Sequence, residues 1–231
     1  MKTKNLCIIP ARGGSKRIPR KNIKVFKGKP IIAYSIEKAL VSGLFKEVMV
    51  STEDEEIAEI ARRFGASVPF FRSTETAGDL ATTMDVLEEV TKRYEEQQQI
   101  FDLICCIYPT APLLTIEQLK KGHRQLLQGD FDVVLPVVPF SYPVWRGLKR
   151  AEDGKTSMYW PENLNKRSQD LPVVFHDAGQ WYWMKKATIG KPMFGEKVGS
   201  FVLKAEDVHD IDNNSDWHLA ELKYEYLQRF K

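Results

Sequence analysis

The chain has 231 residues, of which 43% are hydrophobic and 28% charged, so it contains enough apolar material for a buried core. The 34 Lys and Arg residues stand against 31 Asp and Glu, a formal net charge of +3. This excess is too small to indicate general nucleic-acid binding. Three cysteines, Cys7, Cys105 and Cys106, lie in apolar runs without zinc-site spacing. They are expected to be buried small hydrophobic residues in a reducing cytoplasm.

Neither a secretory signal nor a membrane span is expected. The first five residues are polar, and the apolar run behind them is interrupted by Pro10 and Arg12. The charge-free stretch 103–116 contains two prolines and is too short to cross a bilayer.

Strand and helix patterns alternate through the first 138 residues. Short apolar runs predict strands at 6–9, 47–51, 67–71, 101–108 and 131–138. Apolar residues at helical spacing predict helices between them, at about 32–40, 57–64, 82–94 and 115–127. Two of these helices begin with capping-box spacing, at Thr82 with Asp85 and at Thr115 with Gln118. The alternation predicts an α/β fold, a mostly parallel sheet with helices on both faces.

The alternation of strand and helix patterns ends after residue 138. Residues 139–170 are rich in Pro, Trp, Tyr and charge, and we interpret them as an insertion with a hairpin near Asp153 and Gly154. Strand composition returns at 180–184 and 200–203, and a final helix begins at about Ser215. We therefore expect residues 1–231 to form one domain. The insertion carries four aromatic residues that predict a contact surface: Tyr142, Trp145, Tyr159 and Trp160.

The loop that follows the first strand is the strongest functional signal. It leaves the carboxyl edge of the sheet, where open α/β folds bind ligands. Gly13 and Gly14 allow the backbone to approach a ligand and to direct N–H groups at it. Five cations follow within ten residues, and together they suit a triphosphate: Arg12, Lys16, Arg17, Arg20 and Lys21. The loop matches neither GxxxxGK[ST] nor GxGxxG. The alternative is a solvated basic turn.

A second candidate is the Asp210-Ile211-Asp212 segment. Alternation in an extended segment directs both carboxylates to the same side. Two carboxylates on one face suit Mg²⁺, which takes few protein ligands and leaves positions for water and phosphate oxygens. The alternative is a solvated acidic pair.

Several sequence blocks, in the same order along nearly the whole chain, resemble the sialic-acid-type cytidylyltransferases, the CMP-acylneuraminate synthetases. These blocks are IIPARGGSKRIPRKN at 8–22, VSTEDEEIAEIARRFGA at 50–66, FRSTE at 71–75, DLATT at 79–83, YPTAPL at 108–113, RSQDLP at 167–172 and HDIDNNSDW at 209–217. Three longer blocks look most like the pseudaminic acid branch of that family: CIYPTAP, PVVPFSYPVWR and RSQDLPVVFHDAGQWYW.

The resemblance implies a fold and a reaction. The fold is a three-layer, doubly wound α/β structure of the nucleotide-diphospho-sugar transferase type, with a mostly parallel mixed sheet and a small dimerisation insertion. The reaction transfers CMP from CTP to the anomeric hydroxyl of an acidic nine-carbon sugar and releases pyrophosphate. The resemblance also implies Mg²⁺ as cofactor and a homodimer in which the partner's segment reaches toward the sugar site.

The resemblance and the residue types together assign candidate sites. The catalytic residues are expected to be Arg12, Lys21 and Asp210, and the Mg²⁺ ligands Asp210 and Asp212. The nucleotide is expected to bind Pro10, Ala11, Arg12, Gly13, Gly14, Ser15, Lys16, Asn22, Arg72, Ala81 and Thr83. The sugar is expected to bind Tyr108, Arg167, Gln169, His176, Asp177 and Gln180.

Several of these residues have a structural alternative. The Ala81-Thr82-Thr83 turn resembles the family's nucleotide contacts, but Thr82 could equally be only a helix cap. Arg167 could be a partner in a salt bridge, and His176 could be a surface residue. Trp181 and Trp183, which alternate with Tyr182 on a predicted strand, suit core packing better than sugar stacking. The general base stays open between Asp210 and a metal-bound hydroxide.

Tyr108 bears on the identity of the sugar. The sialic-acid branch usually has Gln at this position, and an Arg-x-Asn-Gly type sequence near 176–179. An aromatic ring with one hydroxyl suits a methyl-terminated sugar tail better than an amide does, so pseudaminic acid is favoured. N-acetylneuraminic, legionaminic and 3-deoxy-octulosonic acids are alternatives. An inactive nucleotide-binding module is the non-enzyme alternative, and an RNA-binding domain is disfavoured because the aromatic-basic sheet motif is missing.

Overall fold

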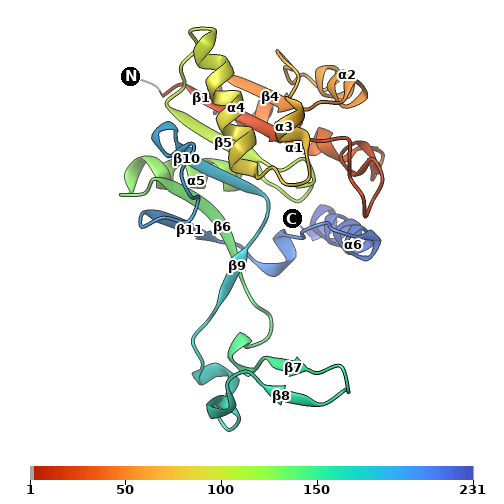
Figure 1. Ribbon diagram of the computed structural model, residues 1–231, viewed down its shortest axis with the longest axis vertical. Helices are drawn as coiled ribbons and strands as arrows, with labels where there is room; N and C mark the ends of the chain where they lie inside the picture. Colours follow the sequence, from red (N-terminus) through yellow and green to blue (C-terminus); the bar gives the residue numbers. More distant parts are fainter. Residues whose placement is uncertain (1–2, 231) are drawn as a thin grey trace.

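The fold is built on one central sheet (Figure 1). The structure is a computed structural model that describes residues 3–230. Within this range the sheet has seven strands in the order β11-β6-β10-β5-β1-β4, with β9 paired to β6. The central strand β1 (Asn5–Pro10) runs parallel to β4 (Glu47–Ser51) and to β5 (Leu103–Ile107). β11 (Val198–Val202) runs parallel to β6 (Val133–Pro139). This arrangement confirms the α/β class and the mostly parallel sheet.

The sheet is mixed because two strands of its second half run antiparallel to their neighbours. β10 (Trp181–Lys185) lies between β5 and β6 and is antiparallel to both, and β9 (Phe175–Asp177) is antiparallel to β6. The strand predicted at 67–71 is wrong, since only Ser67 makes a bridge, to Met49. Pro69 has no N–H to donate to a ladder at this point, which explains why the pairing stops.

Helices cover both faces, which confirms the three-layer prediction. α1 (Ile31–Ser42), α2 (Glu55–Arg63) and α5 (Ile116–Gln128) pack on one face of the sheet. α4 (Thr83–Glu96) packs on the other face, and the short helix α3 (Thr74–Ala77) precedes it. Both predicted capping boxes are present, at Thr82 with Asp85 and at Thr115 with Gln118. The three cysteines are free and fully buried between these layers, as predicted.

The C-terminal helix α6 (Asn214–Phe230) closes a smaller cluster beside the first loop. Trp217 and Tyr224 of α6 pack edge-on against Phe26, which lies in the hairpin of β2 (Val25–Phe26) and β3 (Lys29–Pro30). The segment that carries Asp210 and Asp212 immediately precedes α6. The packing of α6 therefore anchors that segment next to the loop that follows β1.

The chain between β6 and β9 forms an arm that extends away from the sheet (Figure 1). It contains the hairpin of β7 (Leu148–Arg150) and β8 (Thr156–Met158), and Gly154 adopts a φ of +85° in its turn. Tyr142 and Tyr159 are 85% and 60% exposed, whereas Trp145 and Trp160 pack edge-on against each other and are half-buried. The predicted hairpin is present, and two of the four predicted aromatics form the exposed surface.

Short 3₁₀ turns complete the described chain. They are η1 (Lys21–Ile23), η2 (Val144–Arg146), η3 (Pro161–Asn163), η4 (Ser168–Asp170), η5 (Lys186–Thr188) and η6 (Ala205–Asp207). Across residues 3–230, no helix is both long and apolar enough to cross a membrane.

Gly122 provides a test of the layer packing. It faces the sheet from α5, and a Cβ at this position would lie 2.3 Å from Cη2 of Trp181, a fully buried side chain. We expect Gly122→Ala to lower the free energy of unfolding by about 2 kcal/mol. The cost of overpacking against Trp181 should exceed the gain of about 1 kcal/mol that alanine brings in helix propensity. Urea denaturation measures this change.

The matched control is Gly195→Ala, since a Cβ there would have no heavy atom within 4 Å. Equal stability of both variants and the wild type would contradict the tight contact between α5 and β10.

Candidate active site

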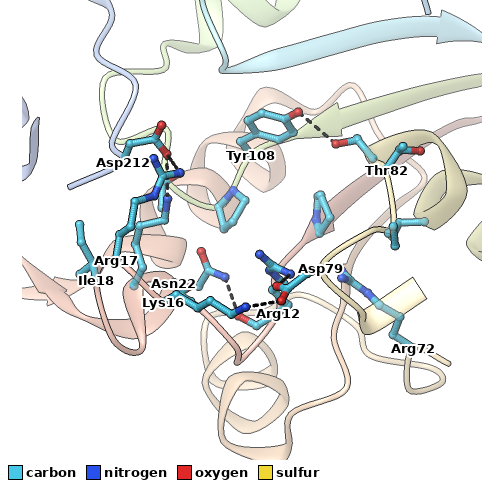
Figure 2. A pocket seen from close by; sticks show the side chains of 18 of the residues that line it. Arg12, Lys16, Arg17, Ile18, Asn22, Arg72, Asp79, Thr82, Tyr108 and Asp212 are labelled. Atoms are coloured by element: carbon cyan, nitrogen blue, oxygen red, sulfur yellow. Dashed lines mark hydrogen bonds and ion pairs between the residues drawn. The ribbon is translucent and has the colours of Figure 1, made fainter. Parts of the chain in front are cut away.

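A pocket of about 490 Å³ opens at the carboxyl ends of β1 and β5 (Figure 2). The structure brings eleven of the predicted site residues to its wall: Pro10, Arg12, Ser15, Lys16, Lys21, Asn22, Arg72, Ala81, Thr83, Tyr108 and Asp212. The wall also contains Arg17, one of the five loop cations, and Thr82, from the predicted turn at 81–83. Six further residues of the wall were not predicted as ligands: Ile18, Thr76, Asp79, Val86, Pro109 and Thr110. The loop after β1 thus faces residues from α3, from α4 and from the segment before α6.

Ion pairs and hydrogen bonds on the far side of the loop hold it in place. Arg20 adopts a left-handed φ of 55°, and its guanidinium binds both carboxylate oxygens of Asp54 and one of Glu56. The Asp54 pKa lies below its usual range because of the bond from Arg20. Gly13 donates its N–H to Glu53 Oε1 at 2.7 Å, and the Asn22 amide donates to the Arg12 carbonyl. Arg20 is therefore a structural residue, unlike the other four cations of the loop.

The placement of Ala11, Gly13 and Gly14 differs from the prediction. None of the three lines the pocket. Ala11 is fully buried and donates its N–H to the Ser51 carbonyl, and the N–H of Gly13 is already bound to Glu53. Gly13 must be a glycine for packing, because a Cβ would lie 2.5 Å from the Asp54 Oδ2 atom. Ala11 and Gly13 therefore shape the loop from behind.

Each of two acidic residues in the pocket is paired with two cations of the loop (Figure 2). Asp79 accepts from Arg12 Nη1 at 2.7 Å and from Lys16 Nζ at 2.5 Å. Both bonds hold the Asp79 pKa below its usual range, that from Lys16 most strongly. Since Asp79 lies far from the loop in sequence, this pairing could not be read from spacing.

Asp212 pairs in the same way with Arg17 Nη2 at 2.8 Å and with Lys21 Nζ at 4.0 Å. Lys21 also donates to the Ile211 carbonyl at 2.6 Å. Burial lowers the Lys21 pKa, while the Asp212 and Asp210 carboxylates oppose this shift. The loop and the segment before α6 are thus joined at Lys21.

The opposite wall of the pocket is built around Arg72. This side chain is only 8% exposed and donates to the carbonyl and hydroxyl of Ser51, at 2.6 and 3.1 Å. Burial lowers the Arg72 pKa. Thr82 accepts a hydrogen bond from the Asp85 N–H and therefore caps α4, as one of its two interpretations predicted. It also lines the pocket. A fixed, buried guanidinium at this end can recognise a polar edge of a ligand.

Tyr108 connects this wall to β9 and β10. Its hydroxyl lies 3.1 Å from Thr83 Oγ1, and its ring packs edge-on against Tyr182 at 5.4 Å. Tyr182 donates to Asp177 Oδ2 at 2.6 Å, and the Gly179 N–H donates to the other oxygen of Asp177. Burial raises the pKa of both tyrosines. Tyr182 thus packs against the pocket wall and also orients Asp177.

The other predicted sugar ligands do not gather in this pocket. Arg167 forms an ion pair with Asp170 at 2.9 Å, which is the salt bridge that was predicted as the alternative to sugar binding. Gln169 lies close to it in sequence, in η4 of the arm. His176 is exposed on β9 and packs against Phe140. Gln180 is 2% exposed and donates to the Asp207 carbonyl, so its side chain is turned away from the pocket. One chain alone therefore does not assemble the predicted sugar pocket.

Of the two predicted Mg²⁺ ligands, Asp212 lines the pocket, whereas Asp210 is exposed and lies outside the pocket wall. They flank the fully buried Ile211, and partial desolvation together with the Asp212 carboxylate raises the Asp210 pKa. Asp216 instead accepts the N–H groups of Asp212 and Asn213, and Asn213 Oδ1 caps α6 by accepting the N–H groups of Ser215 and Asp216. No cluster of three or more His, Cys, Asp or Glu suited to a metal occurs within residues 3–230. Two carboxylates suffice for Mg²⁺, which keeps waters and takes phosphate oxygens.

The chain is similar to known nucleotidyltransferases. It is 42% identical to the pseudaminic acid cytidylyltransferase of Campylobacter jejuni over 96% of both chains. It is 34% identical to the N-acylneuraminate cytidylyltransferase A of Danio rerio, over 97% of this chain and 52% of that protein. The solved structure of CMP:2-keto-3-deoxy-manno-octonic acid synthetase, complexed with CTP, has the same fold, with a TM-score of 0.71 at 17% identity, covering 99% of this chain and 100% of that one.

A family model described as cytidylyltransferase matches residues 6–190, from the beginning of β1 to the turn after β10. This range contains the loop after β1, Arg72, the pocket wall at α4 and the arm. The chain therefore belongs to the cytidylyltransferase family.

Proposed function

We propose that the chain transfers CMP from CTP to the anomeric hydroxyl of an acidic nonulosonic sugar, with pseudaminic acid as the preferred acceptor, and releases pyrophosphate. One observation carries this proposal. Four cations of a single loop, Arg12, Lys16, Arg17 and Lys21, line the same pocket as the buried Arg72 guanidinium. The loop end suits a triphosphate, and the Arg72 end suits the polar edge of a base, with Thr83 near the ribose.

Catalysis would depend on positioning and charge neutralisation, because phosphoryl-type transfer leaves little covalent chemistry to the protein. Arg12 and Lys21 would neutralise charge that develops on the phosphates while the sugar hydroxyl attacks the α-phosphorus. Lys21 is already oriented by the Ile211 carbonyl, and Arg12 by Asp79. Asp210 is our candidate for accepting the hydroxyl proton, because Lys21 joins its chain segment to the loop through the Ile211 carbonyl. Partial desolvation and the Asp212 carboxylate also raise its pKa.

Asp210 and Asp212 are the residues that would hold Mg²⁺, and Mg²⁺ would supply further charge neutralisation at the phosphate oxygens. Two mutually repelling carboxylates beside a phosphate-binding loop support this assignment. We also propose a cytoplasmic location, because the three free cysteines suit a reducing compartment.

We further propose that the active unit is a homodimer in which the arm of one chain completes the sugar site of the other. The arm holds Arg167 and Gln169 away from the pocket of its own chain, and it exposes Tyr142 and Tyr159 (Figure 1). A closed two-fold dimer would exchange the two arms symmetrically.

The preference for pseudaminic acid is supported by Tyr108 and by the comparisons. Tyr108 presents an aromatic ring where Gln is usual in the sialic-acid branch, and its hydroxyl already contacts Thr83. The chain is 42% identical to the C. jejuni protein and 34% identical to the D. rerio protein. It is also 30% identical to the CMP-N,N'-diacetyllegionaminic acid synthase of Legionella pneumophila, so legionaminic acid is the competing acceptor to test.

Substitution of the paired carboxylates tests the metal assignment. We expect Asp210→Asn and Asp212→Asn each to reduce kcat at least about a hundredfold, as does the loss of other charge-stabilising groups. Isothermal titration should show that Mg²⁺ no longer tightens CTP binding to either variant. Asp130→Asn, at an acid paired with Lys197 far from the pocket, is the control. Normal turnover of both site variants at saturating Mg²⁺ would contradict the assignment.

Mixing two inactive variants tests the exchanged arms. Lys21→Ala removes a pocket residue, and Arg167→Ala removes an arm residue. We expect each variant alone to be inactive, and their unfolded and co-refolded mixture to regain about a quarter of wild-type activity, because half of the dimers carry one intact site of two. Light scattering checks the dimer mass. An inactive mixture of correctly assembled dimers would show that Arg167 serves its own chain or none.

Acceptor competition tests the sugar assignment. At equal concentrations we expect transfer to pseudaminic acid about tenfold faster than transfer to N-acetylneuraminic acid, with legionaminic acid in between. Tyr108→Gln should reduce this ratio, while Tyr108→Phe, which keeps the ring, should preserve it. Chromatography of the CMP-sugars measures all three rates. Equal or reversed rates for the wild type would discard pseudaminic acid and retain the cytidylyltransferase reaction.

A further inference from the structure

Asp79 is the acidic residue in the pocket that the proposed reaction does not use. The pocket is lined by two carboxylates, Asp79 and Asp212. Asp212 is assigned to the metal. Asp79 lies on the opposite side, and each of its oxygens binds one cation of the phosphate loop, Arg12 or Lys16. A carboxylate in this position occupies donors that a phosphate group would need.

The segment that carries Asp79 is connected only lightly to the rest of the fold. It runs from Gly78 to Ala81, between the short α3 and α4, and none of its residues belongs to a hydrophobic core cluster. The next residue along, Leu80, is 97% exposed. The helices on either side have their own caps, at Ser73 and at Thr82. The segment can therefore move outward without breaking the packing of either helix.

The ion pairs of Asp79 are exposed and therefore weak enough to exchange. Their side chains are between 37% and 77% exposed, and pairs of this exposure are screened by water and salt. A pyrophosphate or triphosphate presents several charged oxygens to Arg12 and Lys16, whereas Asp79 presents one charge. The polyanion can replace the carboxylate, and the carboxylate can return when the polyanion leaves.

We infer that Asp79 is a displaceable counter-ion for the phosphate loop. It binds Arg12 and Lys16 in the empty site, yields them to the β- and γ-phosphates of the substrate, and competes with the product pyrophosphate for them. This inference rests on the proposed function for its substrates. Its consequence is that Asp79 weakens binding of every anion at this end of the pocket and thereby favours release of pyrophosphate.

The test is direct binding of inorganic pyrophosphate, measured by isothermal titration in the presence of EDTA so that no metal contributes. We expect Asp79→Asn to bind pyrophosphate at least about threefold more tightly than the wild type. The substitution removes the carboxylate that competes with pyrophosphate for Arg12 and Lys16 through two exposed ion pairs. The affinity should also fall more steeply with salt, because more loop charge is available to the anion. In turnover, pyrophosphate should become a correspondingly stronger inhibitor.

Two further variants separate displacement from a simple change in net charge. Glu75→Gln changes the charge by the same amount at an exposed position on α3 outside the pocket wall, and should leave pyrophosphate binding unchanged. Asp79→Ser replaces the carboxylate with a smaller neutral side chain and should reproduce the effect of Asp79→Asn. Unchanged or weaker pyrophosphate binding by both Asp79 variants would overturn the inference. Failure of the wild type to bind CTP would instead overturn the proposed function.

Discussion

The structure depends on keeping four cationic side chains together at the end of one buried strand. Such a concentration of charge repels itself, and the fold opposes that repulsion from both sides. Behind the loop, Arg20 is held by Asp54 and Glu56, and the Gly13 N–H is held by Glu53. In front of it, Asp79 and Asp212 each neutralise two of the cations. The pocket is therefore organised for a polyanion before any polyanion arrives.

The mixed topology of the sheet explains how the second half of the chain reaches this pocket. The antiparallel strand β10 lies directly beside β5, so Tyr182 packs against Tyr108 at the pocket wall. The chain just before β10 also places Gly179 against Asp210. A Cβ on Gly179 would lie 3.6 Å from the carboxyl carbon of Asp210. One short segment thus connects the arm, the pocket wall and the proposed metal ligands. Gln180, first expected to bind sugar, stabilises this junction from within through the Asp207 carbonyl.

The sequence predicted those features that local patterns control. Most apolar runs form the expected strands and helices, and both capping boxes are present, because periodicity and capping chemistry act over a few residues. The loop after β1 reaches the pocket as expected, but its two glycines do not line it. The pairing of Asp79 with Arg12 spans 67 residues, and no spacing rule could have indicated it. The burial of Gln180 depends on how the segment at Asp207 folds back, which local pattern does not contain. The strand predicted at 67–71 does not form beyond Ser67, because Pro69 has no N–H to donate to a ladder.

The central claim is that a sugar hydroxyl attacks the α-phosphorus of CTP in this pocket. The most direct measurement is ³¹P NMR of a reaction between CTP and pseudaminic acid that carries ¹⁸O at its anomeric hydroxyl. We expect pyrophosphate and a CMP-sugar phosphodiester to appear together, with the ¹⁸O retained in the bond between sugar and phosphorus. Formation of CDP and phosphate, or a CMP-sugar that has lost the label, would contradict it.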